Sequence, residues 1–155
     1  MRIATCGART SVSGITSTAA GDCSDRRNTP SRALGTMVAP SLAAAETLAA
    51  QGVQATVVNA RFAAPLDATM FTGLAQSTGR IVTVEENVTA GGFGSAVSEM
   101  FAAAGVTVPT LHLGVPNEFV LHGKRDELLA QVGLDAKGIA ERVLAFVRQP
   151  HHQYH

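Results

Sequence analysis

From residue 34 onward the chain alternates between helical and extended patterns, and this alternation restricts the fold more than any other feature. A helical apolar stripe covers residues 39–50, and after Gly52 a short apolar run covers residues 53–59. Short connections of this kind are typical of helices that cover a parallel sheet. We therefore expect an α/β fold with three layers, in which a doubly wound, mostly parallel sheet has helices on both faces.

The later part of the chain repeats the alternation. Extended runs predict strands at residues 81–85, 108–113 and 119–121, and the Val57-Val58 pair indicates that the strand at 53–59 is covered on both faces. Helices are expected after the N-caps Asp67 and Asp135, after the glycine turn at 91–94, and around residues 127–132. Leu66 with Phe71, and Leu134 with Ile139, have the spacing of hydrophobic staples.

The first 33 residues have a different composition. They are rich in Arg, Ser and Thr and contain few large apolar side chains, so they cannot bury enough surface to offset their ordering entropy. A doubly wound domain begins with an apolar strand, yet polar residues 28–32 hold that place, and Pro30 has no N–H for a ladder. We expect a disordered segment at 1–33, a domain at 34–148 with its first strand missing or replaced, and a polar tail at 149–155.

Two origins explain the front segment. A gene fragment or frameshift would join out-of-frame residues, up to about residue 32, to a true domain. A targeting peptide would explain the Arg and Ser content, but Asp22 and Asp25 count against it. We favour the first explanation.

Bulk properties exclude several classes of partner. Twelve basic residues balance twelve acidic ones, so no net field attracts nucleic acid or an anionic membrane. No apolar run approaches the roughly 18 residues that span a bilayer. Cys6 and Cys23 lack metal-ligand spacing, and the tail histidines His151, His152 and His155 lack a fixed geometry. We expect a cytoplasmic protein without a metal site.

Three stretches together carry a resemblance to a known family. They are Asn59-Ala60-Arg61-Phe62 with Pro65-Leu66-Asp67, then Val82-Thr83-Val84-Glu85-Glu86-Asn87 running into Gly91-Gly92-Phe93-Gly94-Ser95-Ala96-Val97, and the stretch from Leu113-Gly114 to His122-Gly123. The combination resembles the third, transketolase C-terminal-like domain of 1-deoxy-D-xylulose-5-phosphate synthases. The similarity extends over residues 34–148.

The resemblance implies part of an enzyme that joins pyruvate to glyceraldehyde 3-phosphate with loss of carbon dioxide, for isoprenoid, thiamine and pyridoxal synthesis. In that family thiamine diphosphate, magnesium and the catalytic residues belong to the first two domains, while the third packs against them and supports the dimer. None of those catalytic residues has a match here, and Gly21-Asp22-Cys23 is a poor match to a magnesium-diphosphate loop. We therefore expect no cofactor and no catalysis from this chain alone, and the thiamine-binding domains and a second copy as partners.

The glycine turn formed by Gly91, Gly92, Phe93, Gly94 and Ser95 is the first candidate site. It lies between a strand and a helix, where free amides and the helix dipole can hold an anion. The alternative is that the glycines allow close packing at a domain contact. Because the dinucleotide fingerprint and the P-loop lysine are absent, we favour packing, and a stand-alone phosphate-binding or small-anion module is the alternative function.

The second candidate is a structural ion pair. Glu85 and Glu86 are adjacent on a strand and should point to opposite faces, so they are a poor acid and base pair. We expect at least one of the two glutamates to be solvated or paired with a lysine or arginine, and Arg61 and Arg80 are the candidate cationic partners. A structural, hydrogen-bonded role is also expected for His112 and His122.

Overall fold

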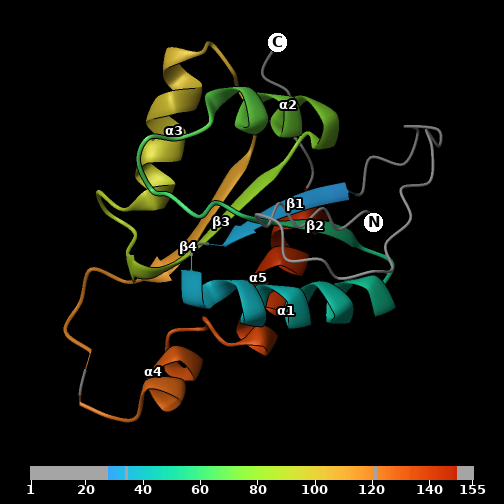
Figure 1. Ribbon diagram of the computed structural model, residues 1–155. Helices are drawn as coiled ribbons and strands as arrows, with labels where there is room; N and C mark the ends of the chain where they lie inside the picture. The colour runs from blue at the N-terminus through green and yellow to red at the C-terminus, as the bar shows by residue number, and fades with distance from the viewer. Residues whose placement is uncertain (1–27, 34, 121, 150–155) are drawn as a thin grey trace, which may run out of the picture.

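Four parallel strands form the central sheet, in the order β2-β1-β3-β4 (Figure 1). This computed structural model describes residues 28–33, 35–120 and 122–149. The strands are β1 (Asn28–Ala33), β2 (Gln54–Asn59), β3 (Ile81–Val88) and β4 (Thr110–Val115). Since all the pairings are parallel, all four strands end at the same edge of the sheet, which we call the carboxyl edge.

Helices cover both faces of the sheet, as the alternation predicted. A short 3-10 turn, η1 (Gly35–Met37), leads into α1, and the α-helices are α1 (Val38–Ala50), α2 (Ala68–Thr78), α3 (Phe93–Ala103), α4 (Arg125–Gln131) and α5 (Ala136–Arg148). In Figure 1, α2 and α3 lie above the sheet, and α1 and α5 lie below it. The three-layer, doubly wound α/β fold is thus confirmed.

Each face of the sheet has its own apolar core. The larger core packs α1, α4 and α5 against the sheet and includes Leu48, Val57, Leu113 and Val143. The smaller core lies under α2 and α3, and two of its side chains, Phe71 and Phe93, meet edge to face with ring centroids 6.1 Å apart. Burial of each large apolar side chain stabilises the fold by about 1.5–3 kcal/mol.

The helix ends follow the predicted caps. Asp67 accepts a hydrogen bond from the Met70 N–H at 2.9 Å, and Asp135 accepts one from the Gly138 N–H at 3.0 Å. Leu134 and Ile139 are both buried, as their staple spacing predicted. In β2 the pair Val57-Val58 is buried, which confirms a strand covered on both faces.

The front of the domain requires a correction. Residues 28–33 were expected to be disordered and outside the domain, but they form β1 between β2 and β3. The first strand is therefore replaced by a polar segment and is not missing. A ladder joins backbone groups, so it does not require apolar side chains. Pro30 pairs with Thr56 of β2 and lies outside the register with β3, which begins at Ser31. The predictions for residues 1–27 and 150–155 lie outside the described residues.

The predicted strand at 119–121 is also wrong for its described part. Phe119 and Val120 lie in the loop between β4 and α4 and have no ladder partner among the described residues, while Leu121 lies outside them. A short aromatic and β-branched run favours a strand only where a neighbouring strand and a buried face are present. Phe119 pairs with no strand among the described residues, and its side chain is fully exposed instead of lying on a buried face.

Candidate functional site at the carboxyl edge

The three stretches that carry the family resemblance gather at the carboxyl edge. Residues 59–67 begin at the last residue of β2, residues 82–97 run from β3 into α3, and residues 113–120 run from the last half of β4 into the loop after it. The strand order reverses between β1 and β3, and the carboxyl edge at such a reversal is the usual ligand site in doubly wound folds. This edge is therefore the candidate functional site.

Glu85 is buried at this edge and caps α3. Its side chain is 1% exposed, and its carboxylate accepts hydrogen bonds from the N–H groups of Phe93 at 2.8 Å and Gly94 at 2.9 Å. These are the amides that an external anion would use at the start of α3. The protein's own carboxylate thus occupies the position expected for a phosphate.

The rest of the glycine turn is satisfied internally. The Ser95 hydroxyl accepts from the Gly91 N–H at 3.0 Å and donates to the Thr89 carbonyl at 2.9 Å. A Cβ on Gly92 would overlap the Glu85 carboxylate and the Val88 carbonyl oxygen. These contacts support the packing interpretation of the turn and leave the anion-binding alternative without free amides at Phe93 and Gly94.

His112 has a structural position beside this turn. Its Nδ1 lies 2.7 Å from the Thr83 hydroxyl and its Nε2 lies 2.9 Å from the Ser98 hydroxyl, so the imidazole links β3, β4 and α3. Burial lowers the pKa of His112, and the nearby Glu85 charge opposes this effect. A Cβ on Gly94 would lie 2.5 Å from Nδ1, so only glycine lets α3 approach the ring. His122, by contrast, lies exposed in the loop before α4.

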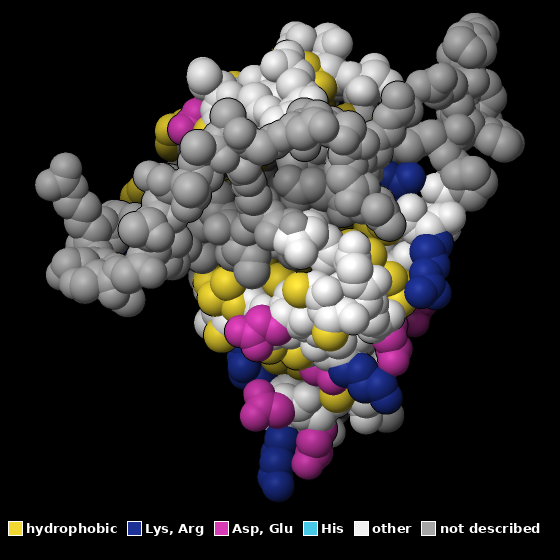
Figure 2. Space-filling view, turned by 90° about the vertical axis from the view of Figure 1, so that its right-hand side faces the viewer, with side chains coloured by type: hydrophobic (Ala, Val, Ile, Leu, Met, Phe, Trp, Pro, Cys, Tyr) yellow, Lys and Arg dark blue, Asp and Glu magenta, His cyan; other side chains and the backbone are white. Residues whose placement is uncertain are grey.

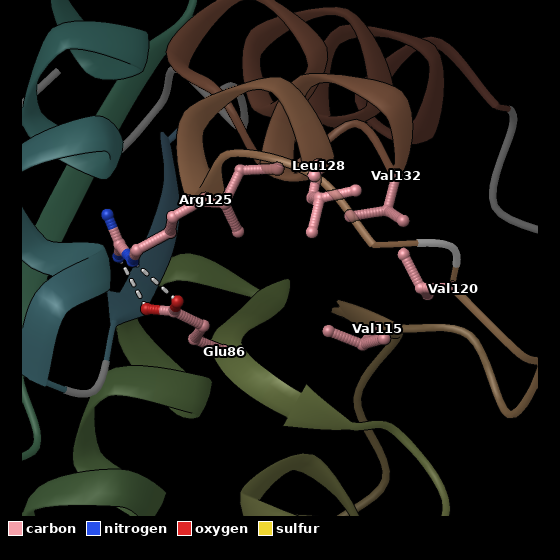
Figure 3. A pocket seen from close by; sticks show the side chains of 8 residues that line it. Glu86, Val115, Val120, Arg125, Leu128 and Val132 are labelled. Atoms are coloured by element: carbon pink, nitrogen blue, oxygen red, sulfur yellow. Dashed lines mark hydrogen bonds and ion pairs between the residues drawn. The ribbon is translucent and has the colours of Figure 1, made fainter.

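Glu86 points to the other side and forms an ion pair with Arg125, a partner that the sequence did not predict. Its carboxylate accepts from Arg125 Nε at 2.7 Å and Nη2 at 2.5 Å (Figure 3). It also accepts from the Thr36 hydroxyl at 2.6 Å. These hydrogen bonds hold the pKa of Glu86 below its usual value. The contacts tie the end of β3 to α4 and to the turn after β1.

The predicted cationic partners were wrong. Arg80 donates to the carbonyl oxygens of Phe146 and Gln149 at the end of α5, and its guanidinium lies 5.5 Å from the centroid of the Phe146 ring. Arg61 has no acidic partner among the described residues. Glu85 belongs to no ion pair in that set either, because it accepts from backbone amides instead. One signal for the cap was missed, namely an acidic residue at the end of a buried strand, eight positions before the first residue of a helix.

Two hollows flank the Glu86–Arg125 pair. The first has a volume of about 340 Å³ and has apolar walls that include Val115, Val120 and Leu128 (Figure 3). The second, of about 440 Å³, is lined by Thr36, Asn87 and Phe93 among others. Glu86 lines both hollows, and Arg125 lines the apolar one.

Exposed large apolar side chains are found on the segments that follow the strand ends. In the described part of the chain they are Phe62 (66% exposed), Val88 (37%), Phe119 (fully exposed) and Val120 (36%). Residues of this size are usually covered in a folded protein, and several on one surface indicate an interaction site. Sequence reasoning missed this group because it expected Phe119 and Val120 to belong to a strand and assigned no surface role to Phe62 or Val88.

The described residues show no feature of the other site classes. They contain no group of three or more His, Cys, Asp and Glu side chains that could hold a metal ion. None of their helices is long and apolar enough to cross a membrane. On the part of the face in Figure 2 that described residues form, the visible Lys and Arg side chains are interspersed with Asp and Glu. Cys6, Cys23 and the tail histidines lie outside the described residues.

Comparison with known families identifies the domain. The family model of the transketolase C-terminal domain matches residues 33–139. The chain belongs to the transketolase C-terminal domain family. The match begins at the last residue of β1, so most of that polar strand lies outside it.

Curated relatives of this transketolase C-terminal domain have names that agree with the resemblance. The chain is 52% identical over 111 residues to the 1-deoxy-D-xylulose-5-phosphate synthase of Gloeobacter violaceus, an alignment that covers 72% of this chain and 17% of the relative. It is 50% identical over 117 residues to 1-deoxy-D-xylulose-5-phosphate synthase 1 of Geobacter metallireducens, covering 75% and 19%. The chain thus spans less than a fifth of the length of these relatives.

Solved transketolase structures share the fold. A structure titled as a split gene transketolase, inactive beta4 tetramer, has a TM-score of 0.72 and 33% identity, covering 78% of this chain and 39% of that one. A transketolase mutant from Pichia stipitis has a TM-score of 0.51 at 21% identity, covering 79% and 17%, and this likeness concerns the fold alone. In all of these proteins the matched domain is one part of a longer chain.

Proposed function

We propose that this chain is the C-terminal domain of a 1-deoxy-D-xylulose-5-phosphate synthase, that it packs against the thiamine-binding domains and supports the dimer, and that it does not catalyse the reaction alone. The whole enzyme would be a cytoplasmic transferase of isoprenoid precursor synthesis that acts on pyruvate and glyceraldehyde 3-phosphate. Thiamine diphosphate and magnesium would be held by the other domains.

The observation that carries the proposal is the combination of family membership with the filled helix terminus. The family match covers residues 33–139, and the named relatives are synthases. Within this domain the amides best placed for a phosphate are occupied by Glu85. A domain that satisfies its own helix terminus and exposes Phe62 and Phe119 is better suited to docking than to ligand binding.

Complementation in trans tests this function. The probe is the Gloeobacter violaceus synthase without its C-terminal domain, assayed with pyruvate, glyceraldehyde 3-phosphate, thiamine diphosphate and magnesium. We expect this chain to restore product formation to the truncated enzyme and to form no product alone. Adding back the relative's own C-terminal domain is the positive control. If that control restores activity and this chain does not, the proposal is wrong, and turnover by the chain alone would contradict its inactivity.

A further inference from the structure

We infer that the carboxyl edge of the sheet, and not either helical face, is the surface that binds the thiamine-binding part of a synthase. This inference rests on the proposed function and adds to it the contact surface and the chemistry of the partner. The partner presents apolar side chains to the two exposed phenylalanines and to the apolar hollow, and a carboxylate to Arg61.

The first argument is the position of the exposed apolar side chains. Phe62 follows β2, Val88 ends β3, and Phe119 follows β4, so parallel strand ends bring them to one edge. A phenylalanine side chain can bury about 150–250 Å² in a contact. The two faces of the sheet are not open to a partner, because α1 and α5 cover one face and α2 and α3 cover the other (Figure 1). None of the exposed large apolar side chains of the described residues lies in a helix.

The second argument is the conformation of Arg61. Its φ of 54° lies in the left-handed region, which costs a non-glycine residue roughly 1–3 kcal/mol. The Asn59 side chain accepts from the Arg61 N–H at 3.1 Å and stabilises this turn. The turn holds an exposed guanidinium that has no acidic partner in the part of the chain that the structure describes. Arginine and aromatic residues are enriched at the centres of protein interfaces, and Arg61 lies beside Phe62. A carboxylate on the partner would form an ion pair with the Arg61 guanidinium.

The third argument is the apolar hollow beside the loop that carries Phe119. Val115 of β4, Leu128 of α4 and the C-cap residue Val132 point into it, and Val120 closes one side (Figure 3). Arg125 at its rim is already paired with Glu86, so this rim requires no further charge from a partner. An apolar side chain therefore fits the hollow better than an ionic group does.

The size of the relatives identifies the occupant. The matched domain accounts for 17% and 19% of the synthases of Gloeobacter violaceus and Geobacter metallireducens, so most of each polypeptide is available to cover this edge. A second copy of this chain is the competing occupant. It would have to present an acidic group to Arg61. Glu85 and Glu86 already accept hydrogen bonds, so the exposed Glu118 beside Phe119 is the carboxylate that a second copy could offer, and the sedimentation measurement below tests this occupant.

Binding measurements on edge variants test the inference. The full chain and its Phe119→Asp and Arg61→Glu variants are titrated by calorimetry against the Gloeobacter violaceus synthase without its C-terminal domain. Thr107→Asp is the matched control, because Thr107 is an exposed loop residue before β4, at the opposite edge. We expect each edge variant to bind at least about 10-fold more weakly, as at an interface centre, and the control to bind within about 2-fold of the parent chain.

The outcomes separate this inference from the proposed function. Parent binding that is weakened by both edge variants and unchanged by Thr107→Asp supports both. Parent binding that the edge variants do not weaken leaves the function standing and overturns the choice of surface. No parent binding, while the relative's own domain binds, overturns the function. Thermal melts confirm that each variant is folded, and Phe119→Ala replaces Phe119→Asp if the charge prevents folding. Sedimentation of the chain alone tests the second-copy alternative, because a dimer lost in the edge variants would contradict our choice of partner.

Discussion

Replacing Glu85 by glutamine tests whether a buried carboxylate holds the start of α3. Glu85→Gln keeps the size of the side chain and one acceptor oxygen, but it turns the other acceptor into an NH2 group that faces an amide N–H. In the wild type both oxygens accept, from Phe93 at 2.8 Å and Gly94 at 2.9 Å, and the group is 1% exposed. The substitution therefore removes one hydrogen bond and the charge that favours the helix N-terminus.

The magnitude follows from the number and kind of the bonds. A hydrogen bond to a charged group contributes about 1.5–3 kcal/mol, and a buried amide left without a partner adds a desolvation cost. We expect Glu85→Gln to lower the free energy of unfolding by about 2–3 kcal/mol, which for a domain of this size lowers Tm by roughly 4–10 °C. Glu85→Ala, which loses both acceptors, should cost more.

Urea and thermal unfolding followed by circular dichroism measure this effect. Glu86→Gln is the matched control at the adjacent position, where the side chain is exposed and the lost contact is screened by water. Its effect should be clearly smaller. If Glu85→Gln unfolds within about 0.5 kcal/mol of the wild type, the range of an ordinary surface substitution, our account of the cap is refuted.

Three further predictions concern neighbouring contacts. Gly92→Ala should destabilise the domain by about 2 kcal/mol or more, because the added Cβ overlaps the Glu85 carboxylate. Gly73→Ala in α2, where a Cβ meets open space, should stabilise the domain by about 0.5–1 kcal/mol. Urea titrations measure both effects. Because burial lowers the pKa of His112, the unfolded state binds more protons than the folded state below about pH 6.5, so the free energy of unfolding should fall as the pH drops from that value. His112→Gln should flatten this dependence. Arg80→Met should lower the free energy of unfolding by about 1–2 kcal/mol, because the hydrogen bonds to the Phe146 and Gln149 carbonyls are lost. Amide hydrogen exchange in the last turn of α5 should become faster. Unchanged exchange there would count against a capping role for Arg80.

Local signals made much of the fold predictable. Asp67, Asp135 and Gly79 act within a few residues of the helix ends that they define, so the sequence contains both partners of each interaction. The spacing of the apolar residues is also a local pattern, and it predicted that helices cover both faces of the sheet. The α/β fold and most element positions therefore follow from patterns shorter than about 15 residues.

The parts that were missed depend on contacts over long distances in the sequence. Arg125 lies 39 residues from Glu86, and nothing near either residue indicates the pair. The strand β1 was missed because its side chains are polar, while its place in the sheet depends on backbone pairing with β2 and β3. Phe119 was assigned to a strand because a short run cannot reveal whether a neighbouring strand exists.

The adjacent glutamates at the end of β3 have different roles: one stabilises the domain, and the other borders the surface that we expect to bind the partner. Because strand side chains alternate, Glu85 faces inward and completes the helix terminus, while Glu86 faces outward and fixes α4 beside the apolar hollow. The Glu85 carboxylate accepts hydrogen bonds from the Phe93 and Gly94 amides, so these N–H groups are not free to bind a phosphate. The outward one neutralises Arg125, which leaves Arg61 as the cation at this edge that has no acidic partner among the described residues. If this division of roles is correct, Glu85→Gln should lower stability and leave the affinity for the truncated synthase unchanged once the domain is folded. Arg61→Glu should weaken binding to the truncated synthase and leave the free energy of unfolding unchanged. If either variant changes both the stability and the affinity, the two roles are not separate.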